Sequence, residues 1–299
     1  MIQVGIDFGG TKIEAAALDA DGGFLARRRR PTPSAYADAI AAVRDLIHQV
    51  ETEAGGRGSV GIGTPGSISP RTGVLRNANT VWLNGRNFRL DLESALERPV
   101  RMANDANCLA LSESVDGAAA GQRSVFAVII GTGCGGGLVI DGRLVAGANG
   151  IAGEWGHVAL PWTTAEENAG PPCWCGNRGC LETWVSGRGM EREHAARTSH
   201  TFSAEAIVAA ARSGHPEAIV TFDGYVDRLG RALAMICNIV DPDMFVFGGG
   251  LSNVPELYQR LPVAMTPYLF GDSCEVKLVP AMWGDSSGVR GAARLWSQE

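Results

Sequence analysis

The chain has 299 residues, of which 45% are hydrophobic and 19% charged, a composition typical of a globular protein with one large or two ordinary domains. Its net charge of −6 argues against a nucleic-acid partner, because neutralising phosphates requires a basic surface. The opening segment MIQVGIDFGG carries Asp7 inside its apolar run and has no basic region, unlike a signal peptide. The most apolar window, residues 125–140, is too short to span a bilayer. We therefore expect a cytoplasmic protein with neither a nucleic-acid nor a membrane partner.

The N-terminal part of the chain predicts strands joined by glycine turns. Residues 2–7 and 13–19 predict a β-hairpin. Residues 34–53 carry apolar side chains at helical spacing and predict a helix. Residues 59–66 and 99–105 predict two further strands, and a helix is expected directly after the second of them.

The rest of the chain repeats this alternation. Residues 125–145 predict a second hairpin of the same kind as the first, which indicates an internal duplication. Two helices are expected at 203–212 and 216–240, and Pro216 and Asp241-Pro242 bound the longer one. A buried strand at 244–250 and a final helix at 287–296 complete the pattern. Alternating strands and helices predict the α/β class.

Glycine-rich turns follow several of the predicted strands. The pattern G-x-G-x-x-G occurs at 61–66 and 131–136, but neither copy opens a helix, so neither is a dinucleotide fingerprint. The stretch DFGGTK (residues 7–12) lies between two strands, where glycines let backbone N–H groups approach phosphate oxygens. An ordinary hairpin turn explains it equally well on its own. Two further glycine turns, 131–137 and 248–250, favour a nucleotide site.

Together these residues resemble the ROK family of sugar kinases, within the actin/hexokinase-like ATPase superfamily. The matching stretches cover nearly the whole chain: DFGGTK, GIGTPGSISP, ANDAN, IIGTGCGGGL, GEWGH, CWCGNRGCLE, FGGGLSN and GDSSGVRGAA. Three stretches are most similar to the bacterial fructokinase or manno(fructo)kinase branch: NANTVWLNG, ANDANCLALSESVDGAAAG and VFAVIIGTGCG.

The resemblance implies a two-lobed actin/hexokinase-like (ribonuclease H-like) ATPase fold with a nucleotide cleft between the lobes. Residues 1–115 and the final helix 288–299 would form the N-terminal lobe. Residues 116–287 would form the C-terminal lobe, with a zinc loop at 157–180. The implied reaction is the phosphorylation of a sugar hydroxyl by ATP with Mg²⁺, and relatives suggest a homodimer. The implied nucleotide-binding residues are Asp7, Gly9, Gly10, Thr11, Lys12, Gly131, Thr132, Gly133, Gly248, Gly249 and Gly250.

Asp105 is the candidate catalytic base. It lies where a predicted strand ends and a helix begins, and phosphoryl transfer to an alcohol requires a base near the hydroxyl. From the residues alone, Asp105 could equally be a helix cap. The resemblance favours the base, and it places Asn104 against the sugar.

Three cysteines and a histidine predict a metal site. His157 precedes Cys173, Cys175 and Cys180, and Cys₃His is a donor set that closes a tetrahedral zinc site. With no open position, the zinc would be structural. Structureless thiols and a zinc finger are the alternatives, but neither the spacing nor the surface charge suits a finger. We interpret Cys108, Cys134, Cys237 and Cys274 as buried thiols.

The zinc loop is also the expected sugar wall. By resemblance, the sugar-binding residues are Gly66, Asn79, Asn104, Asp105, Glu154, His157 and Glu182. Asn77 is an alternative to Asn79. Trp162 and Trp174 are interpreted as packing residues, although Trp174, between two zinc ligands, could also stack on a sugar. The segment RRRR (27–30) is interpreted as a solvated strand end, and His194 as a surface residue.

The function predicted first is an ATP:hexose 6-phosphotransferase that converts fructose to fructose 6-phosphate. A glucokinase, mannokinase or N-acetylhexosamine kinase of the same family is the alternative, because such sugars differ by hydrogen bonds that one sequence does not display. A ROK-type regulator is the non-enzyme alternative, although a leading helix-turn-helix segment would then be expected. An actin-like switch ATPase is a third, against which the Asn104-Asp105 pair argues.

Overall fold

The computed structural model describes residues 1–78, 80–271 and 275–297. The chain forms two compact units, unit 1 (Met1–Arg123, Gly137–Gly153 and Met282–Glu299) and unit 2 (Ser124–Gly136 and Glu154–Ala281). Unit 1 therefore contains residues 116–123, 137–153 and 282–287, which were predicted to belong to the other lobe. Close packing explains the second of these segments, because a Cβ at Gly137 would lie only 2.5 Å from the carbonyl oxygen of Ala106.

The sheet of unit 1 is formed by the strands β1 (Gln3–Phe8), β2 (Lys12–Leu18), β3 (Phe24–Pro31), β4 (Ser59–Thr64) and β7 (Val100–Asn104). Their order is β3-β2-β1-β4-β7. The pairs β1–β2 and β2–β3 are antiparallel, whereas β4 is parallel to both β1 and β7. The predicted first hairpin is thereby confirmed, and the carboxyl ends of β1, β4 and β7 lie at one edge of the sheet.

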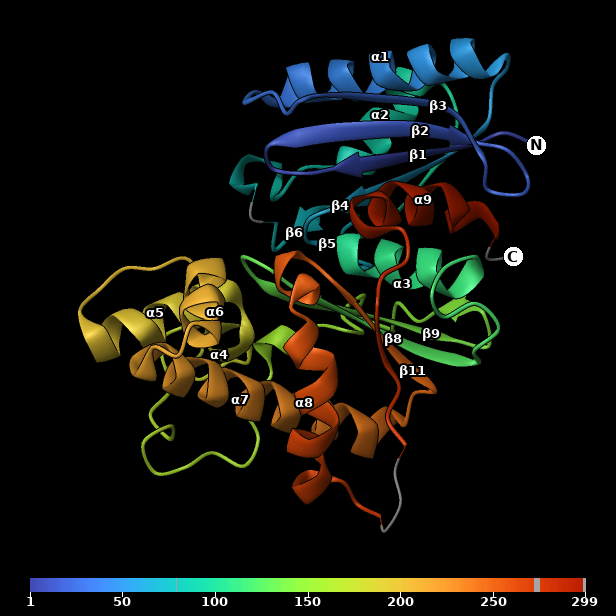
Figure 1. The fold of residues 1–299 in the computed structure, drawn as a ribbon. Coiled ribbons are helices and arrows are strands. Elements are labelled where there is room, and N and C mark those ends of the chain that lie inside the picture. Colours follow the sequence, from blue (N-terminus) through green and yellow to red (C-terminus); the bar gives the residue numbers. More distant parts are fainter. Residues whose placement is uncertain (79, 272–274, 298–299) are drawn as a thin grey trace. The chain divides into compact units, whose positions relative to one another are not determined.

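The α-helices in the described part of unit 1 are α1 (Tyr36–Ala54), α2 (Phe88–Leu96), α3 (Asp105–Val115) and α9 (Ser287–Ala293). Helix α1 covers one face of the sheet and α9 the other (Figure 1). The apolar side chains of α1 and the strands form a continuous buried core between them. Helix α9 packs directly on the strand backbones, because a Cβ at Gly5 or Gly61 would lie 2.0 Å or 1.8 Å from a carbonyl oxygen of this helix.

A short hairpin, β5 (Ser67–Ile68) and β6 (Leu75–Arg76), also belongs to unit 1.

The second sheet has the same topology as the first. Its strands are β8 (Ser124–Ile130), β9 (Cys134–Ile140), β10 (Arg143–Leu144), β11 (Met244–Gly248) and β12 (Leu278–Pro280), in the order β10-β9-β8-β11-β12. In both sheets the third, second, first, fourth and fifth strands in chain order lie side by side. Strand β11 is parallel to β8 and to β12. This agreement is what an internal duplication predicts.

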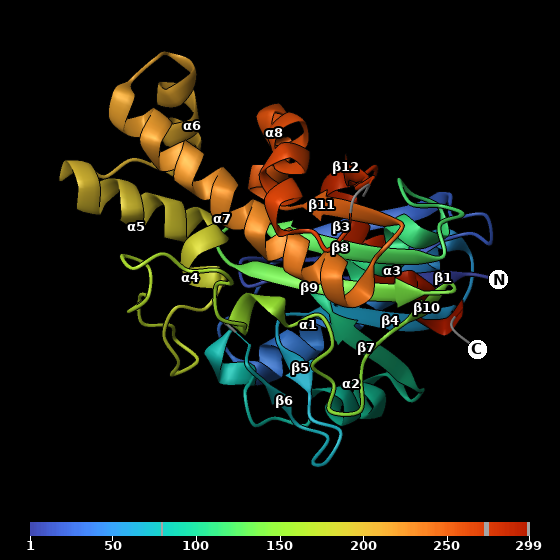
Figure 2. The ribbon, with the colours of Figure 1, turned by 90° about the horizontal axis from the view of Figure 1, so that it is seen from below.

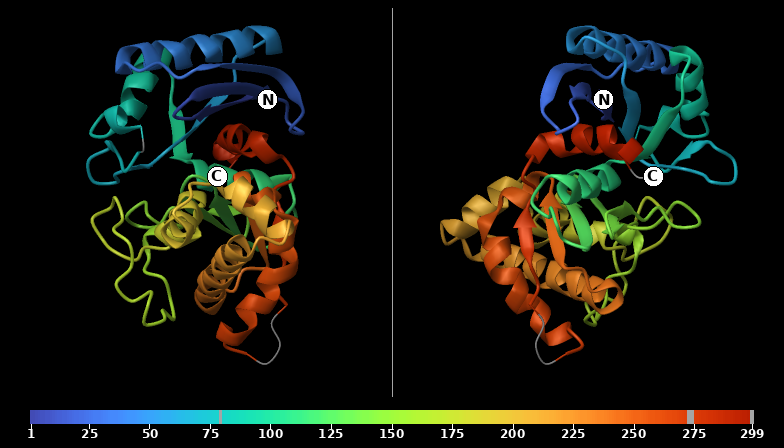
Figure 3. Two further views of the ribbon diagram at one scale, coloured as in Figure 1. Left: turned by 60° about the vertical axis from the view of Figure 1, so that its left-hand side comes forward. Right: turned by 90° about the vertical axis from the view of Figure 1, so that its right-hand side faces the viewer.

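The helices of unit 2 are α4 (Glu182–Val185), α5 (Gly187–Thr198), α6 (Ala204–Arg212), α7 (Pro216–Val240) and α8 (Pro255–Met265). Helix α7 is contacted by the other four (Figure 2). Its bounds match the predicted 216–240, with Pro216 in its first turn. Between η2 (Trp155–His157) and α4 runs a long loop without a helix or named strand, which appears yellow-green in Figure 3. In the described part of the chain, no helix has the length and apolarity that a membrane crossing requires.

Candidate active site and zinc loop

Two carboxylates of unit 1 lie at the carboxyl edge of its sheet. Asp7 is in β1 and pairs with Gly63 of β4, which in turn pairs with Ala103 of β7. Asp105 follows β7 directly as the first residue of α3. Burial, the nearby Asp105 and Glu14 together raise the pKa of Asp7 to about 6. Desolvation by the surrounding protein likewise raises the pKa of Asp105, against the hydrogen bonds that lower it, although the residue is exposed at the surface of unit 1. Such like-charged, desolvated pairs are typical of functional sites.

The helix cap beside Asp105 is Asn104. The side-chain oxygen of Asn104 accepts the N–H groups of Ala106 at 2.8 Å and Asn107 at 3.2 Å. The carboxylate of Asp105 also accepts the N–H of Ala106, at 2.8 Å, but it belongs to the first residue inside the helix. The interpretation of Asp105 as the cap is therefore corrected: the neighbouring asparagine supplies the cap, and Asp105 is an exposed acidic residue in the first turn.

The turn after β1 contains the predicted phosphate-binding residues of unit 1. The N–H of Gly9 donates to the carbonyl oxygen of Lys12 at 3.0 Å, which closes the β1–β2 hairpin, and the N–H of Thr32 donates to Thr11 at 3.0 Å. The turn is thus tied to β3 as well. Lys12 is exposed at the start of β2, and Gly10 is exposed in the turn.

Gly66 cannot be replaced without strain. Its φ is +76°, and a Cβ there would lie 2.3 Å from the carbonyl oxygen of Arg76. It therefore allows the backbone before β5 to approach the segment after β6. Of the two candidate asparagines in that segment, Asn77 is exposed with φ 59°, and the preferred Asn79 lies outside the described residues.

Unit 2 brings two of the predicted glycine turns together. Strands β8 and β11 are parallel and paired up to Ile129 and Gly248, so the turns 131–133 and 248–250 follow neighbouring strand ends. A Cβ at Gly131 would lie 3.8 Å from the backbone nitrogen of Gly250. Thr132 is exposed between Gly131 and Gly133. Backbone amides clustered in this way suit phosphate oxygens.

The four predicted zinc ligands converge in unit 2. The ligand atoms of His157, Cys173, Cys175 and Cys180 all lie within 4.8 Å of one another. The Sγ atoms of Cys175 and Cys180 are 3.6 Å apart, and Nδ1 of His157 is 3.6 Å from Sγ of Cys173. Tetrahedral zinc with bonds of about 2.3 Å to sulfur and 2.0 Å to nitrogen requires edges of about 3.5–3.8 Å. The donor set therefore fits zinc, and the sulfur separation is too long for a disulfide.

Glu182, a predicted sugar ligand, is held beside the glycine turn. It is the first residue of α4, and its Oε2 accepts the backbone N–H of Cys134 at 3.1 Å. A Cβ at Gly133 would lie 2.8 Å from this oxygen, so the absence of a side chain there makes room for the carboxylate. His157 ends η2, and Glu154 precedes it as the N-cap residue. The structure thus places Glu182, the zinc ligands and two glycine turns in the same unit, and Asp7, Asn104, Asp105 and Gly66 in the other.

An ion-pair cluster that the sequence did not reveal anchors the zinc loop. Glu167, within the loop, is buried and receives hydrogen bonds from Arg228 at 2.6 Å and Arg231 at 2.8 Å, both on α7. Burial alone would raise the pKa of Glu167, but the two guanidinium groups and the N–H of Thr164 lower it to about 2. Arg231 also donates to the carbonyl oxygen of Trp162 at 2.7 Å. The local sequence EEN carries no signal for partners 60 residues away.

Of two predictions outside the site, one is confirmed and one is corrected. The RRRR segment forms the last part of β3, and Arg28–Arg30 are exposed, as predicted for a solvated strand end. Arg29 nevertheless donates to the fully buried Glu14 at 2.6 Å. His194 is buried, not on the surface, because its ring faces Thr221 of α7 at 3.1 Å. Cys108 and Cys134 are buried as expected, Cys237 is half-buried, and Cys274 lies outside the described residues.

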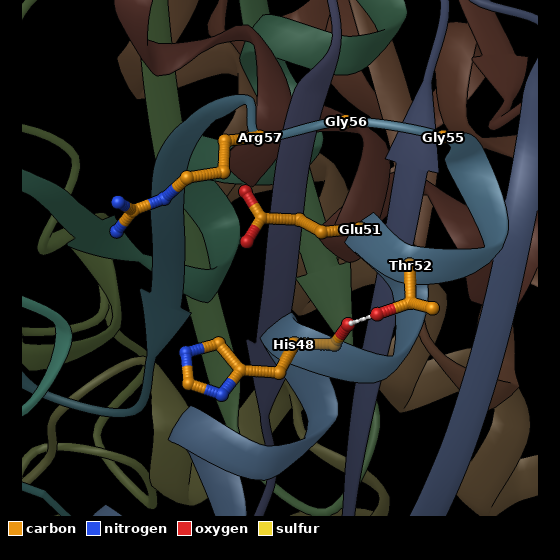
Figure 4. Close-up of a pocket in the computed structure, with 6 residues that line it drawn as sticks. All are labelled: His48, Glu51, Thr52, Gly55, Gly56 and Arg57. Atoms are coloured by element: carbon orange, nitrogen blue, oxygen red, sulfur yellow. Dashed lines mark hydrogen bonds between the residues drawn. The ribbon is translucent and has the colours of Figure 1, made fainter.

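A surface pocket of about 360 Å³ at the end of α1 contains none of the predicted site residues. His48, Glu51, Thr52 and Arg57 line it (Figure 4). Glu51 accepts hydrogen bonds from the N–H of Gly58 at 2.7 Å and from Arg98 at 2.6 Å, so its carboxylate holds the loop after the helix. The hydrogen bonds of Glu51 therefore have a structural role, and the pocket gives no indication of a ligand site.

Comparison with known proteins identifies the family. The ROK family model matches residues 3–299, so the chain belongs to the ROK family. Its fold is the actin/hexokinase-like α/β fold, as predicted. The crystal structure of a ROK hexokinase from Thermus thermophilus superposes with a TM-score of 0.88, at 35% identity, and covers 98% of this chain and 97% of that one.

Curated relatives point to a narrower group of kinases. The N-acetyl-D-glucosamine kinase of Pectobacterium atrosepticum is 40% identical over 296 residues, 97% of each chain. The N-acetylgalactosamine kinase AgaK of a Shewanella species is 42% identical over 272 residues, 89% of this chain and 87% of the relative. Neither relative is named a fructokinase. The predicted fructose branch therefore has no support from these relatives, whose names match the N-acetylhexosamine alternative.

Proposed function

We propose that this protein is an ATP-dependent kinase that phosphorylates the 6-hydroxyl of an N-acetylated hexosamine. The observation that carries the chemistry is Asp105 at the first turn of α3, a solvent-accessible residue with a raised pKa and the Asn104 cap beside it. A base with a raised pKa accepts a proton more readily than an ordinary aspartate. The names of the N-acetylhexosamine kinase relatives supply the substrate class.

The residues of unit 1 would position the reacting groups. Asp105 accepts the proton of the sugar hydroxyl as the phosphoryl group is transferred. The side-chain oxygen of Asn104 is used by the helix cap, so its amide nitrogen is the group that would donate to the sugar. Asp7 would hold Mg²⁺, which neutralises charge on the phosphates when bound. The turn Gly9–Lys12 would contact the phosphate groups.

The residues of unit 2 would bind the sugar and the nucleotide. Glu154, His157 and Glu182 would hydrogen-bond the sugar hydroxyls, and the turns 131–133 and 248–250 would hold the nucleotide. Zinc on His157 and the three cysteines would be structural, since the Cys₃His set leaves no open position. Because Nδ1 of His157 faces the cysteines, Nε2 is the nitrogen left for the sugar.

Sugar-dependent release of ADP tests this function. The purified protein is assayed with Mg-ATP and with N-acetylglucosamine, N-acetylgalactosamine, glucose, mannose and fructose in turn, and kcat/KM is compared across the sugars. We expect the highest value with an N-acetylated sugar. A preference for fructose would restore the first substrate prediction and discard this one. No stimulation by any sugar would contradict the kinase function itself.

A further inference from the structure

Trp174 lies between two zinc ligands and contacts two of the proposed sugar ligands. Its Nε1–H donates to Oε1 of Glu182 at 2.6 Å. Its ring meets the ring of His157 edge to face, with the centroids 4.9 Å apart and the planes at 88°. The residue is 64% exposed, so burial in the core does not explain its position. The sequence interpretation of Trp174 as a packing residue is therefore incomplete.

The hydrogen bond from Trp174 holds the second oxygen of the Glu182 carboxylate. The backbone N–H of Cys134 donates to Oε2 of Glu182, and Trp174 donates to Oε1. Two donors on different oxygens define the plane of the carboxylate and restrict its rotation. A carboxylate offers about four acceptor positions, so two remain for the hydroxyl groups of a ligand. The orientation of the acceptors is thus set before the ligand arrives, which lowers the entropy lost on binding.

Trp174 also links Glu182 to the metal site. Its backbone lies between Cys173 and Cys175, whose thiols face the zinc position. The contact with His157 means that one indole touches both the ring and the carboxylate that would face the sugar. Glu182 in turn reaches the backbone after the turn 131–133. A continuous set of contacts therefore runs from the zinc loop through Trp174 to the glycine turn.

We propose that Trp174 is a positioning residue of the sugar site, which orients the Glu182 carboxylate and supports the His157 ring. The proposal rests on the proposed function, because it assumes that Glu182 and His157 bind the sugar. It predicts that removing the indole N–H weakens sugar binding and leaves the ATP side of the reaction and the zinc content unchanged. A residue that only stabilised the loop would alter zinc content or overall stability instead.

The test compares Trp174→Phe with a matched control, Trp162→Phe. Trp162 lies in the same loop, is 48% exposed and packs on Tyr268 at 5.0 Å. Phenylalanine at 174 keeps a ring beside His157 but cannot donate to Glu182. Binding of N-acetylglucosamine is measured by calorimetry without ATP, and kcat, both KM values and zinc per chain are measured for each protein.

We expect Trp174→Phe to weaken sugar binding and to raise the sugar KM about tenfold, the loss typical of one hydrogen bond to a charged group. The kcat, the KM for ATP and the zinc content should remain within about twofold of the wild type, and Trp162→Phe should resemble the wild type. Glu182→Gln weakens the same hydrogen bond. The fold-loss in sugar binding of the double variant should therefore be smaller than the product of the fold-losses of the two single variants.

Several outcomes would overturn the proposal. Unchanged sugar binding in Trp174→Phe, an equal loss in Trp162→Phe, loss of zinc, or fully multiplicative losses with Glu182→Gln would each contradict it. If the wild type phosphorylates the sugar and Trp174→Phe has the same sugar KM and sugar affinity, this proposal alone is refuted. A wild type that binds none of the five sugars refutes the proposed function together with it.

Discussion

Replacing Asp7 with asparagine should stabilise the protein without Mg²⁺ while abolishing its proposed metal site. Asp7 lies in β1, and burial together with the negative charges of Asp105 and Glu14 raises its pKa from 3.8 to about 6. This shift corresponds to about 3 kcal/mol of unfavourable free energy in the folded state once Asp7 is ionised. Asparagine has nearly the same shape and no charge, so this cost disappears. The figure is a net value, because the pKa of about 6 already includes the attraction of Lys12 and Arg29, which lowers it.

The pH dependence of this gain follows from the direction of the shift. The folded state binds the Asp7 proton more tightly than the unfolded state, whose pKa is near 3.8. The stability that this proton binding contributes is therefore fully present below pH 3.8 and is lost as the pH rises through about 6. At pH 8 the variant should exceed the wild type in free energy of unfolding by up to about 3 kcal/mol. Near pH 3.5 the two should be equal.

Urea unfolding at several pH values, in EDTA and without nucleotide, measures this difference. Asp21→Asn is the control, since Asp21 is exposed in the turn after β2 and the variant should show no pH-dependent gain. Added Mg²⁺ and ATP should stabilise the wild type more than Asp7→Asn, because only the wild type has the carboxylate. The electrostatic reasoning would be refuted if Asp7→Asn were less stable than the wild type at pH 8. It would also be refuted if the variant exceeded the wild type in stability by the same amount at pH 8 and near pH 3.5.

Three further predictions concern the base, the metal and the loop anchor. Asp105→Asn should lower kcat by about 10²- to 10⁴-fold, as expected for a lost general base, while calorimetry still detects sugar binding. The kcat/KM of the wild type should fall as the pH drops through the raised pKa of Asp105. A variant with full turnover would contradict the assignment of Asp105 as the base. Cys175→Ser should reduce the zinc content measured by elemental analysis and raise the KM for the sugar, while ATP still binds. An unchanged zinc content would exclude Cys175 as a zinc ligand. Glu167→Gln should lower the free energy of unfolding by about 3 kcal/mol, because it leaves the buried Arg231 and the half-buried Arg228 without their carboxylate partner. The difference in stability between wild type and variant should narrow as the pH falls from 4.5 towards 2, and an unchanged stability would show that the ion pairs contribute nothing.

The sequence predicted those helices and strands whose turn residues, caps and apolar spacing all lie within one short segment. The hairpin at 2–19 and helix α7 at 216–240 have turn residues, caps and apolar spacing in their own sequence. Helix α8 was not predicted, although Leu257, Leu261 and Met265 are buried at four-residue spacing, because Pro262 interrupts the pattern. Proline normally disfavours a helix interior. Packing against α7 compensates for that cost in the folded protein.

Long-range polar contacts could not be predicted in the same way. The pairing of Arg29 with Glu14 requires the register of β2 and β3, which places these two residues opposite each other. His194 lies in the largely polar sequence of α5, and only the approach of α7 shows that this residue is buried. Neither contact has a signature at fixed sequence spacing, because the partners are brought together by the tertiary fold.

The zinc loop contains both short-range sequence signals and long-range contacts. Its candidate zinc ligands could therefore be predicted from the sequence, whereas the residues that attach the loop to the helices could not. The cysteines follow one another at short spacing, and a metal imposes the same donor geometry in any fold, so composition and spacing suffice to predict them. The loop carries no helix or named strand, and two side-chain contacts join it to helices elsewhere in unit 2. Glu167 binds α7, and Trp174 binds Glu182 at the start of α4. These two contacts lie on either side of Cys173 and attach the loop to α7 and to α4. In the proposed sugar site, the orientation of Glu182 would therefore depend on Trp174, a residue outside the predicted set of zinc ligands.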